Sequence, residues 1–356
     1  MRRKVFLVFL MFFTTTHTVR TIFVIGIVLV GGVFLLIIKD MIFETKNFTT
    51  STTNTEVLSI DVENKSVVEI ITSTTLDFSD IITTTINLVV PYISQMPDGI
   101  FVKPWSKACE EATIIMIEEF YLKNKISLLP ITVGKQGMSM LFAWEDKNFG
   151  YNDDTDASST ARIINDYSSF NAIVKRNPTL EEIKNEIKNN RPVISLHYGP
   201  ALNNPYLHFK VDGPQYHMIV LKGFDDKNKE FIAHDPGTYQ YSGNDFRYGY
   251  QTIMSSLHDY DIKIKKAKEG VPVVLFTSPK IIIKTPGNTL YFIEDNKKYL
   301  INNPTTTFQQ RRWSFRLIQT KTEDELRNFV DGNPIIHENG LLKTIEDLEE
   351  RLKNYN

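Results

Sequence analysis

Cys109 is the only cysteine among 356 residues, so no intramolecular disulfide and no four-cysteine metal site can form. A lone cysteine is either a small buried apolar residue or a reactive thiol. Cys109 follows the loop-like segment KPWSKA (103–108) and opens a helix-like run, whose dipole favours a thiolate and whose backbone N–H groups suit an oxyanion. Glu110 and Glu111 oppose this effect, because a nearby negative charge raises a thiol pKa. The position is therefore typical of a thiol nucleophile that needs a partner imidazole.

The partner is predicted by a second segment. The apolar runs HMIVLKGF (217–224) and EFIAHDPG (230–237) flank a polar turn, DDKNK, which indicates a β-hairpin. If the turn centres on Asp226, His217 and Asp235 lie directly opposite each other, with Cβ atoms about 4.5–5.5 Å apart. The aspartate would then fix the imidazole tautomer and leave the other ring nitrogen for Cys109. A register slip of one residue would break this alignment.

Each of these residues also has an ordinary interpretation. A histidine at the start of a strand is more often structural than catalytic, and Asp235 precedes Pro236-Gly237, a common turn sequence. Gln95 suits a solvated loop. Other histidines of this region lack the HExxH spacing of a zinc site, so we expect no metal and no cofactor; they are His197, His208, His234 and His258.

The elements that would position these side chains suggest an α+β fold. A strand-like run opens the region, a helix follows, and strands dominate its second half. Thr179 and Glu182 form a capping box for a further helix, whereas 145–159 is polar and is predicted as loop. The predicted strands are 86–93, 191–199 and 271–277 with the two hairpin arms, and the predicted helices are 107–121 and 179–190.

A small C-terminal module is expected over 280–356. Residues 289–301 predict a hairpin that turns at Asp295-Asn296, and Thr322 with Glu325 predicts a capped short helix. An amphipathic helix is expected over 341–352. Nothing in this module pairs catalytic groups.

The N-terminal part predicts a membrane anchor over 1–40. Residues 21–38 carry no charge and have the length of a transmembrane helix, and basic residues precede them, which predicts a cytoplasmic N-terminus and an extracytoplasmic bulk. No small-x-small cleavage site follows, so we expect an uncleaved signal anchor. The Thr/Ser-rich residues 41–84 are interpreted as a stalk. A formal net charge of −2 gives no indication of nucleic-acid binding.

Two segments resemble a known family. VPYISQMPDGIFVKPWSKACEEATIIMIEEFY (90–121) and YHMIVLKGFDDKNKEFIAHDPGT (216–238) are similar to the Gln–Cys and His–Asp segments of papain-like cysteine peptidases of family 39, in particular stand-alone relatives of the double-glycine leader peptidases. The likeness covers about 85–278. It implies a papain-like fold in which Cys109 attacks, Gln95 helps to form the oxyanion hole, His217 is the base and Asp235 orients it. CEEAT stands where many members carry Cys-Gly-Pro.

We therefore expect an anchor (1–40), a stalk (41–84), a papain-like peptidase domain (85–279) and a small module (280–356). The last carries a weaker likeness to short surface-protein modules through TLYFIEDNKKYLI and FVDGNPII, which suggests contact with a cell surface. The expected function is a bacterial, membrane-anchored, extracytoplasmic thiol hydrolase that acts on peptide or amide bonds. Two alternatives stay open: an inactive surface-binding protein on a peptidase scaffold, and a cell-wall peptidoglycan amidase.

Overall fold

The chain divides into two compact units, Met1–Thr75 and Leu76–Asn356. The computed structural model describes residues 84–213, 215–238 and 243–335, together with the backbone of short strands at 7–10, 24–29, 32–37, 337–338 and 341–342. The stalk predicted before residue 84 lies outside the described residues, as does most of the helix predicted over 341–352. In the latter range, Leu341–Leu342 is a strand, β19, that pairs with β18 (His337–Glu338).

The first unit contains three short antiparallel strands, β1 (Leu7–Leu10), β2 (Val24–Leu29) and β3 (Gly32–Ile37). Two of them occupy most of the range in which the sequence predicts a membrane-spanning helix. Valine and isoleucine are abundant there and also favour strands, so an apolar run alone does not decide between the two structures. Among the residues that the structure describes, no helix combines the length and apolar character needed to cross a bilayer. The anchor stays a prediction from the sequence.

The second unit is built on a seven-stranded sheet in which the neighbouring strands pair antiparallel, in the order β5-β12-β6-β7-β8-β9, with β4 also paired to β7. The strands are β4 (Thr85–Asn87), β5 (Phe170–Arg176), β6 (Val193–Tyr198), β7 (Tyr216–Asp225), β8 (Glu230–His234), β9 (Phe246–Gly249) and β12 (Val273–Pro279). A small hairpin, β10 (Asp259–Asp261) with β11 (Lys266–Lys268), forms a separate two-stranded sheet.

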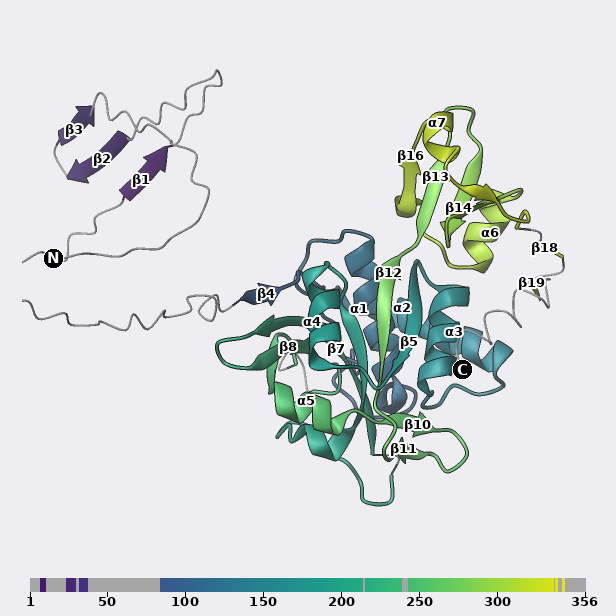
Figure 1. The fold of residues 1–356 in the computed structure, drawn as a ribbon. Coiled ribbons are helices and arrows are strands. Elements are labelled where there is room, and N and C mark those ends of the chain that lie inside the picture. Colours follow the sequence, from purple (N-terminus) through teal and green to yellow (C-terminus); the bar gives the residue numbers. More distant parts are fainter. Residues whose placement is uncertain are drawn as a thin grey trace, which may run out of the picture. The chain divides into compact units, whose positions relative to one another are not determined.

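Helices cover both faces of this sheet (Figure 1). The strand β7 shows why: Met218 and Val220 pack into the core beneath α1 to α3, and the alternate residues Ile219 and Leu221 pack beneath α4 and α5. Because both faces of the strand are apolar, each face needs a helical layer to bury it. The helices are α1 (Cys109–Tyr121), α2 (Ile131–Asn148), α3 (Ala157–Tyr167), α4 (Leu180–Lys188) and α5 (Tyr250–Ser256), with 3-10 turns at Trp105–Lys107 and Gly199–Leu202. The expected mixture of helix and sheet is confirmed.

Of these five helices the sequence predicts only α1 and α4, so the helical layer differs from the prediction at α2, α3 and α5. The range 145–159, predicted as loop, contains the end of α2 and the start of α3, and the connection between them is only 149–156. Asp156 is the N-cap of α3: its side chain accepts a hydrogen bond from Ser159 N, so the helix starts inside this polar stretch. The capping box of Thr179 and Glu182 is present at the start of α4, as predicted, whereas the strand predicted over 86–93 is limited to β4, Thr85–Asn87.

The C-terminal module forms its own five-stranded sheet, in the order β16-β13-β14-β15-β17. Its elements are β13 (Ile281–Lys284), β14 (Leu290–Glu294), β15 (Lys297–Leu300), α6 (Pro304–Gln310), a 3-10 turn (Phe315–Leu317), β16 (Ile318–Thr320), α7 (Glu323–Leu326) and β17 (Val330–Asp331). The predicted hairpin turns at Asp295 and Asn296, both with positive φ, and Thr322 and Glu325 form the predicted capping box. Strand β12 ends at Pro279 and β13 begins at Ile281, so one residue separates the two sheets.

Candidate active site

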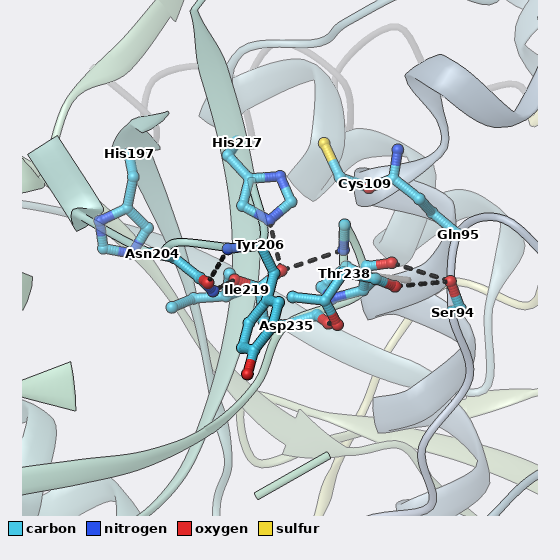
Figure 2. A network of polar contacts seen from close by, with 12 residues as sticks. Ser94, Gln95, Cys109, His197, Asn204, Tyr206, His217, Ile219, Asp235 and Thr238 are labelled. Carbon is cyan, nitrogen blue, oxygen red and sulfur yellow. Dashed lines mark hydrogen bonds and ion pairs between the residues drawn. The ribbon is translucent and has the colours of Figure 1, made fainter. Parts of the chain in front are cut away.

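The β7–β8 hairpin brings His217 and Asp235 together, although its register differs from the one predicted. The ladder pairs Val220 with His234 and carries a bulge between Leu221 and Gly223, and continuing it would place residue 237, not 235, opposite His217. The turn therefore lies further along the chain than predicted, because Asp225 accepts hydrogen bonds from Lys227 N and Asn228 N and so fixes it at 226–229. Asp235 follows the last residue of β8 and nevertheless reaches His217: its Oδ1 lies 2.7 Å from Nε2 (Figure 2).

Further donors surround the Asp235 carboxylate. Its Oδ1 also accepts from Gly237 N at 3.0 Å, and its Oδ2 accepts from Asn204 Nδ2 at 3.1 Å and from the Tyr248 hydroxyl at 2.5 Å. Burial raises the cost of the charge, but the His217 charge and these hydrogen bonds outweigh it and lower the pKa of Asp235. The carboxylate stays ionised, and it holds the Nε2 proton of His217. The Nδ1 atom is left for another partner.

The segment 92–95 is joined to the Asp235 segment by several hydrogen bonds. Tyr92 donates its hydroxyl to Asp235 O at 3.2 Å, Ser94 Oγ lies 3.1 Å from Pro236 O, and Gln95 N donates to Pro236 O at 2.9 Å. Gln95 is thereby fixed beside the histidine–aspartate pair. One N–H of its side-chain amide donates to Trp105 O at 3.0 Å, and the second remains available to a ligand.

Cys109 is the first residue of α1 and is 4% exposed. In Figure 2 its sulfur and the His217 ring point into the same space. The thiol donates to Glu110 Oε2 at 2.9 Å, and within the described residues it makes no hydrogen bond to His217. Burial, followed by the charges of Glu110 and Asp154, raises the pKa of Cys109 well above that of a free thiol. The resting site therefore contains a neutral thiol.

Buried carboxyl groups lie behind Cys109. Burial, together with Glu111 and Asp154, raises the pKa of Glu110, and burial, together with Glu145, raises that of Glu111. Burial also raises the pKa of Glu145, on α2, to about 8. Burial also raises the pKa of Asp154, although its ion pair with Lys107 partly offsets this effect.

Cys109, His217 and Gln95 line one cleft of about 630 Å³. Asp235 lies behind His217 and is fully buried. The structure therefore brings three of the predicted residues to one cleft and places the fourth directly behind it. The other lining side chains are of two kinds, apolar or aromatic (Met96, Phe101, Tyr206, Leu207, Phe209 and Tyr216) and polar or charged (Ser106, Lys107, Asp154, His208, Lys210 and Gln215).

Gly237 closes the cleft behind His217 without a side chain. A Cβ built there would lie 2.6 Å from His217 Cε1 and 2.9 Å from Leu207 Cδ2, so the imidazole occupies the space that any other residue would need. Sequence reasoning missed this role, as it missed Asn204 and Tyr248. The Pro-Gly pair suggested a turn, and nothing local indicated a close approach.

Of the remaining histidines, His208 lines the same cleft, whereas His197 and His234 have other surroundings. His197 is fully buried, its ring nitrogens each lie 2.8 Å from a serine hydroxyl, of Ser195 or Ser256, and burial with the charge of His217 lowers its pKa to about 3. His234 lies 2.7 Å from Val90 O and is not part of the cleft. In the described part of the chain, no three histidine, cysteine or acidic side chains converge as metal ligands would.

Part of the chain is similar to a known family of peptidases. Residues 87–256 match the model of the Peptidase_C39 like family. A crystal structure of a protein assigned as a C39-like peptidase, from Bacillus anthracis, is 14% identical; the match covers 54% of this chain and 97% of that chain, with a TM-score of 0.34. No curated protein matches the chain. The range matched by the family model contains Gln95, Cys109, His217 and Asp235.

Proposed function

Because residues 87–256 form a domain of the Peptidase_C39 like family, we propose that this protein hydrolyses peptide or amide bonds with Cys109 as nucleophile. The observation that carries the proposal is the buried pair of His217 and Asp235, joined at 2.7 Å beside a cleft that Cys109 and Gln95 also line. Nucleophile, base and orienting acid in this order are what thiol-dependent acyl transfer requires.

The reaction follows from the hydrogen bonds. Asp235 holds the proton on His217 Nε2, so Nδ1 accepts the proton of the Cys109 thiol. The thiolate attacks the substrate carbonyl carbon, and His217 returns the proton to the leaving amine as the C–N bond breaks. Water, deprotonated by the same imidazole, then attacks the thioester, and the thiol is regenerated.

The negative charge on the carbonyl oxygen needs donors while the intermediate forms. We assign this role to the second N–H of the Gln95 amide and to the free backbone N–H groups in the first turn of α1. The hydrogen bond from Gln95 to Trp105 O fixes the plane of the amide, so that the donor is positioned before the substrate binds.

The setting of this activity is proposed from the sequence. The apolar run at 21–38, preceded by basic residues, supports a single anchor with the catalytic domain on the extracytoplasmic side. The C-terminal module supports a contact with the cell surface. Peptides or proteins outside the membrane are then the substrates.

One observation favours a second function, an inactive peptide-binding protein on the same scaffold. The Cys109 thiol bonds to Glu110, and its pKa is raised. Such a protein would retain the cleft and bind peptides without turnover.

The test uses the full-length chain in detergent, incubated with a peptide library from a digested proteome, with new peptide termini identified by mass spectrometry. We expect cleavages that are absent in Cys109→Ala and in His217→Ala, because each variant removes one partner of the proton transfer. Purified peptidoglycan is a parallel substrate, and release of stem peptides from it alone would identify an amidase. If the wild-type protein cleaves neither substrate while peptides still bind to Cys109→Ala, the protein is the inactive peptide-binding protein.

A further inference from the structure

Glu110 is bound on both sides of its carboxyl group. Its Oε2 accepts the Cys109 S–H at 2.9 Å and its Oε1 accepts Thr155 N–H at 2.8 Å. Glu110 and Thr155 are both fully buried, and Thr155 is further tied to Thr160 by a 2.8 Å hydroxyl contact. Glu110 therefore cannot turn from the thiol without leaving a buried N–H unpaired, which is unfavourable.

This hydrogen bond competes with the reaction. The thiol has one proton, and in the resting structure it points to Glu110, whereas catalysis requires it to go to His217 Nδ1. An ionised Glu110 would also repel the thiolate once it formed. From these contacts we propose that Glu110 is a positioning residue that restrains the Cys109 proton. The Cys109–Glu110 hydrogen bond must break before His217 can accept that proton. The proposal rests on the proposed function, since it concerns the same nucleophile.

Other charged or titratable groups surround this pair and must be separated from Glu110 in any test. Glu111 follows it on α1, Glu145 faces it from α2, Asp154 with its partner Lys107 lies in the connection before α3, and Tyr216 lies on β7. Of these, Glu111 offers the matched comparison. It is equally buried on the same helix turn and lies close enough to raise the pKa of Cys109, but it makes no hydrogen bond to the thiol.

The substitution Glu110→Gln has a defined expected geometry. Thr155 N–H still needs an acceptor, so the amide oxygen stays on it and the amide nitrogen faces Cys109 Sγ. An acceptor of the thiol proton is thereby replaced by a donor to the thiolate, which favours the thiolate.

The experiment measures alkylation of the single thiol by iodoacetamide against pH in the full-length protein. We expect Glu110→Gln to react about tenfold faster than wild type at pH 7, which corresponds to an apparent pKa about one unit lower. Glu111→Gln should accelerate the reaction by less than about threefold, and adding His217→Ala to Glu110→Gln should abolish the gain. An unchanged or slower reaction in Glu110→Gln, or equal acceleration in both variants, would overturn the proposal.

A second measurement needs no variant. With one cysteine in the chain, the infrared S–H stretching band reports Cys109 alone. We expect the band below the frequency of a thiol in an apolar solvent, as hydrogen bonding to Glu110 requires; a band at the free-thiol frequency would contradict the proposal. Peptide cleavage separates this inference from the proposed function. If wild type cleaves peptides but Glu110→Gln does not change the alkylation rate, the restraint by Glu110 is wrong and the hydrolase is not. If the alkylation rates are as expected but no peptide is cleaved, the proposed hydrolase is wrong and the restraint by Glu110 is not.

Discussion

His217 and Asp235 are joined diagonally across the end of the β7–β8 hairpin. The continued ladder register would put Gly237 opposite the histidine, and the aspartate reaches it from two residues earlier, beyond the last residue of β8. The missing side chain at 237 supplies the space in which the imidazole lies. The pair therefore depends on a strand that ends early and on a glycine, as well as on the two functional side chains.

Asp235→Asn should reduce the rate of peptide cleavage by at least about 100-fold, within the range attributed to positioned acid–base groups. The amide cannot balance the imidazolium charge, and its NH2 group can face Nε2 and favour the wrong tautomer. The measurement is cleavage of the library peptides found with wild type. A loss below about tenfold would show that His217 is oriented by other contacts.

Gly237→Ala should reduce cleavage strongly while the domain remains folded. Its Cβ would lie 2.6 Å from His217 Cε1, so the ring must shift out of line with Asp235. Gly249→Ala is the control, since its Cβ would meet Thr252 Oγ1 at an ordinary 3.6 Å. Circular dichroism establishes folding in both variants, and wild-type cleavage by Gly237→Ala would contradict the assigned close approach.

Tyr248→Phe should destabilise the protein by about 1–3 kcal/mol, because the hydroxyl donates to the buried, ionised Asp235. The free energy of unfolding is measured in urea at pH 7. Tyr250→Phe removes a hydroxyl that donates at 2.8 Å to Asp226, a more exposed carboxylate, and should cost less. Equal losses in the two variants would show that burial of Asp235 does not govern the effect.

Glu145→Gln should make the protein less sensitive to alkaline pH. The pKa of Glu145 is raised by burial from 4.5 to about 8, so between these values the folded state binds more protons than the unfolded state and stability falls as pH rises, by up to about 1.4 kcal/mol per pH unit. The neutral amide removes this dependence. We expect the variant to match wild type near pH 5 and to be more stable near pH 8; parallel pH profiles in urea would contradict the assignment.

Local signals predicted much of this structure. The capping boxes of α4 and α7 and the turn at Asp295-Asn296 each depend on a few adjacent residues, and the start of α1 places Cys109 as expected. The pairing of His217 with Asp235 could be predicted from the hairpin, but its register could not, because the bulge near Lys222 has no clear sequence signal.

Helix α2 shows why other parts were missed. Its Gly134 and Gly137 weaken any helix prediction, yet a Cβ at either position would lie 2.6 Å from a side chain, that of Ile93 or Ile115. The glycines serve close packing against residues distant in sequence. Asn204 and Tyr248 were missed for the same reason, since each reaches Asp235 from a separate segment.

The hydrogen bonds between residues 92–95 and the Asp235-Pro236 segment have a mechanical consequence. Gln95, the proposed oxyanion donor, and Asp235, the proposed support of the base, meet at one backbone group, Pro236 O, which accepts a hydrogen bond from Gln95 N. A displacement of this junction would misalign both the base and the oxyanion donor together, so the two functions would fail as a unit. A compound that separated Gln95 N from Pro236 O would inhibit the enzyme without occupying the cleft. Raising the substrate concentration would then not restore activity.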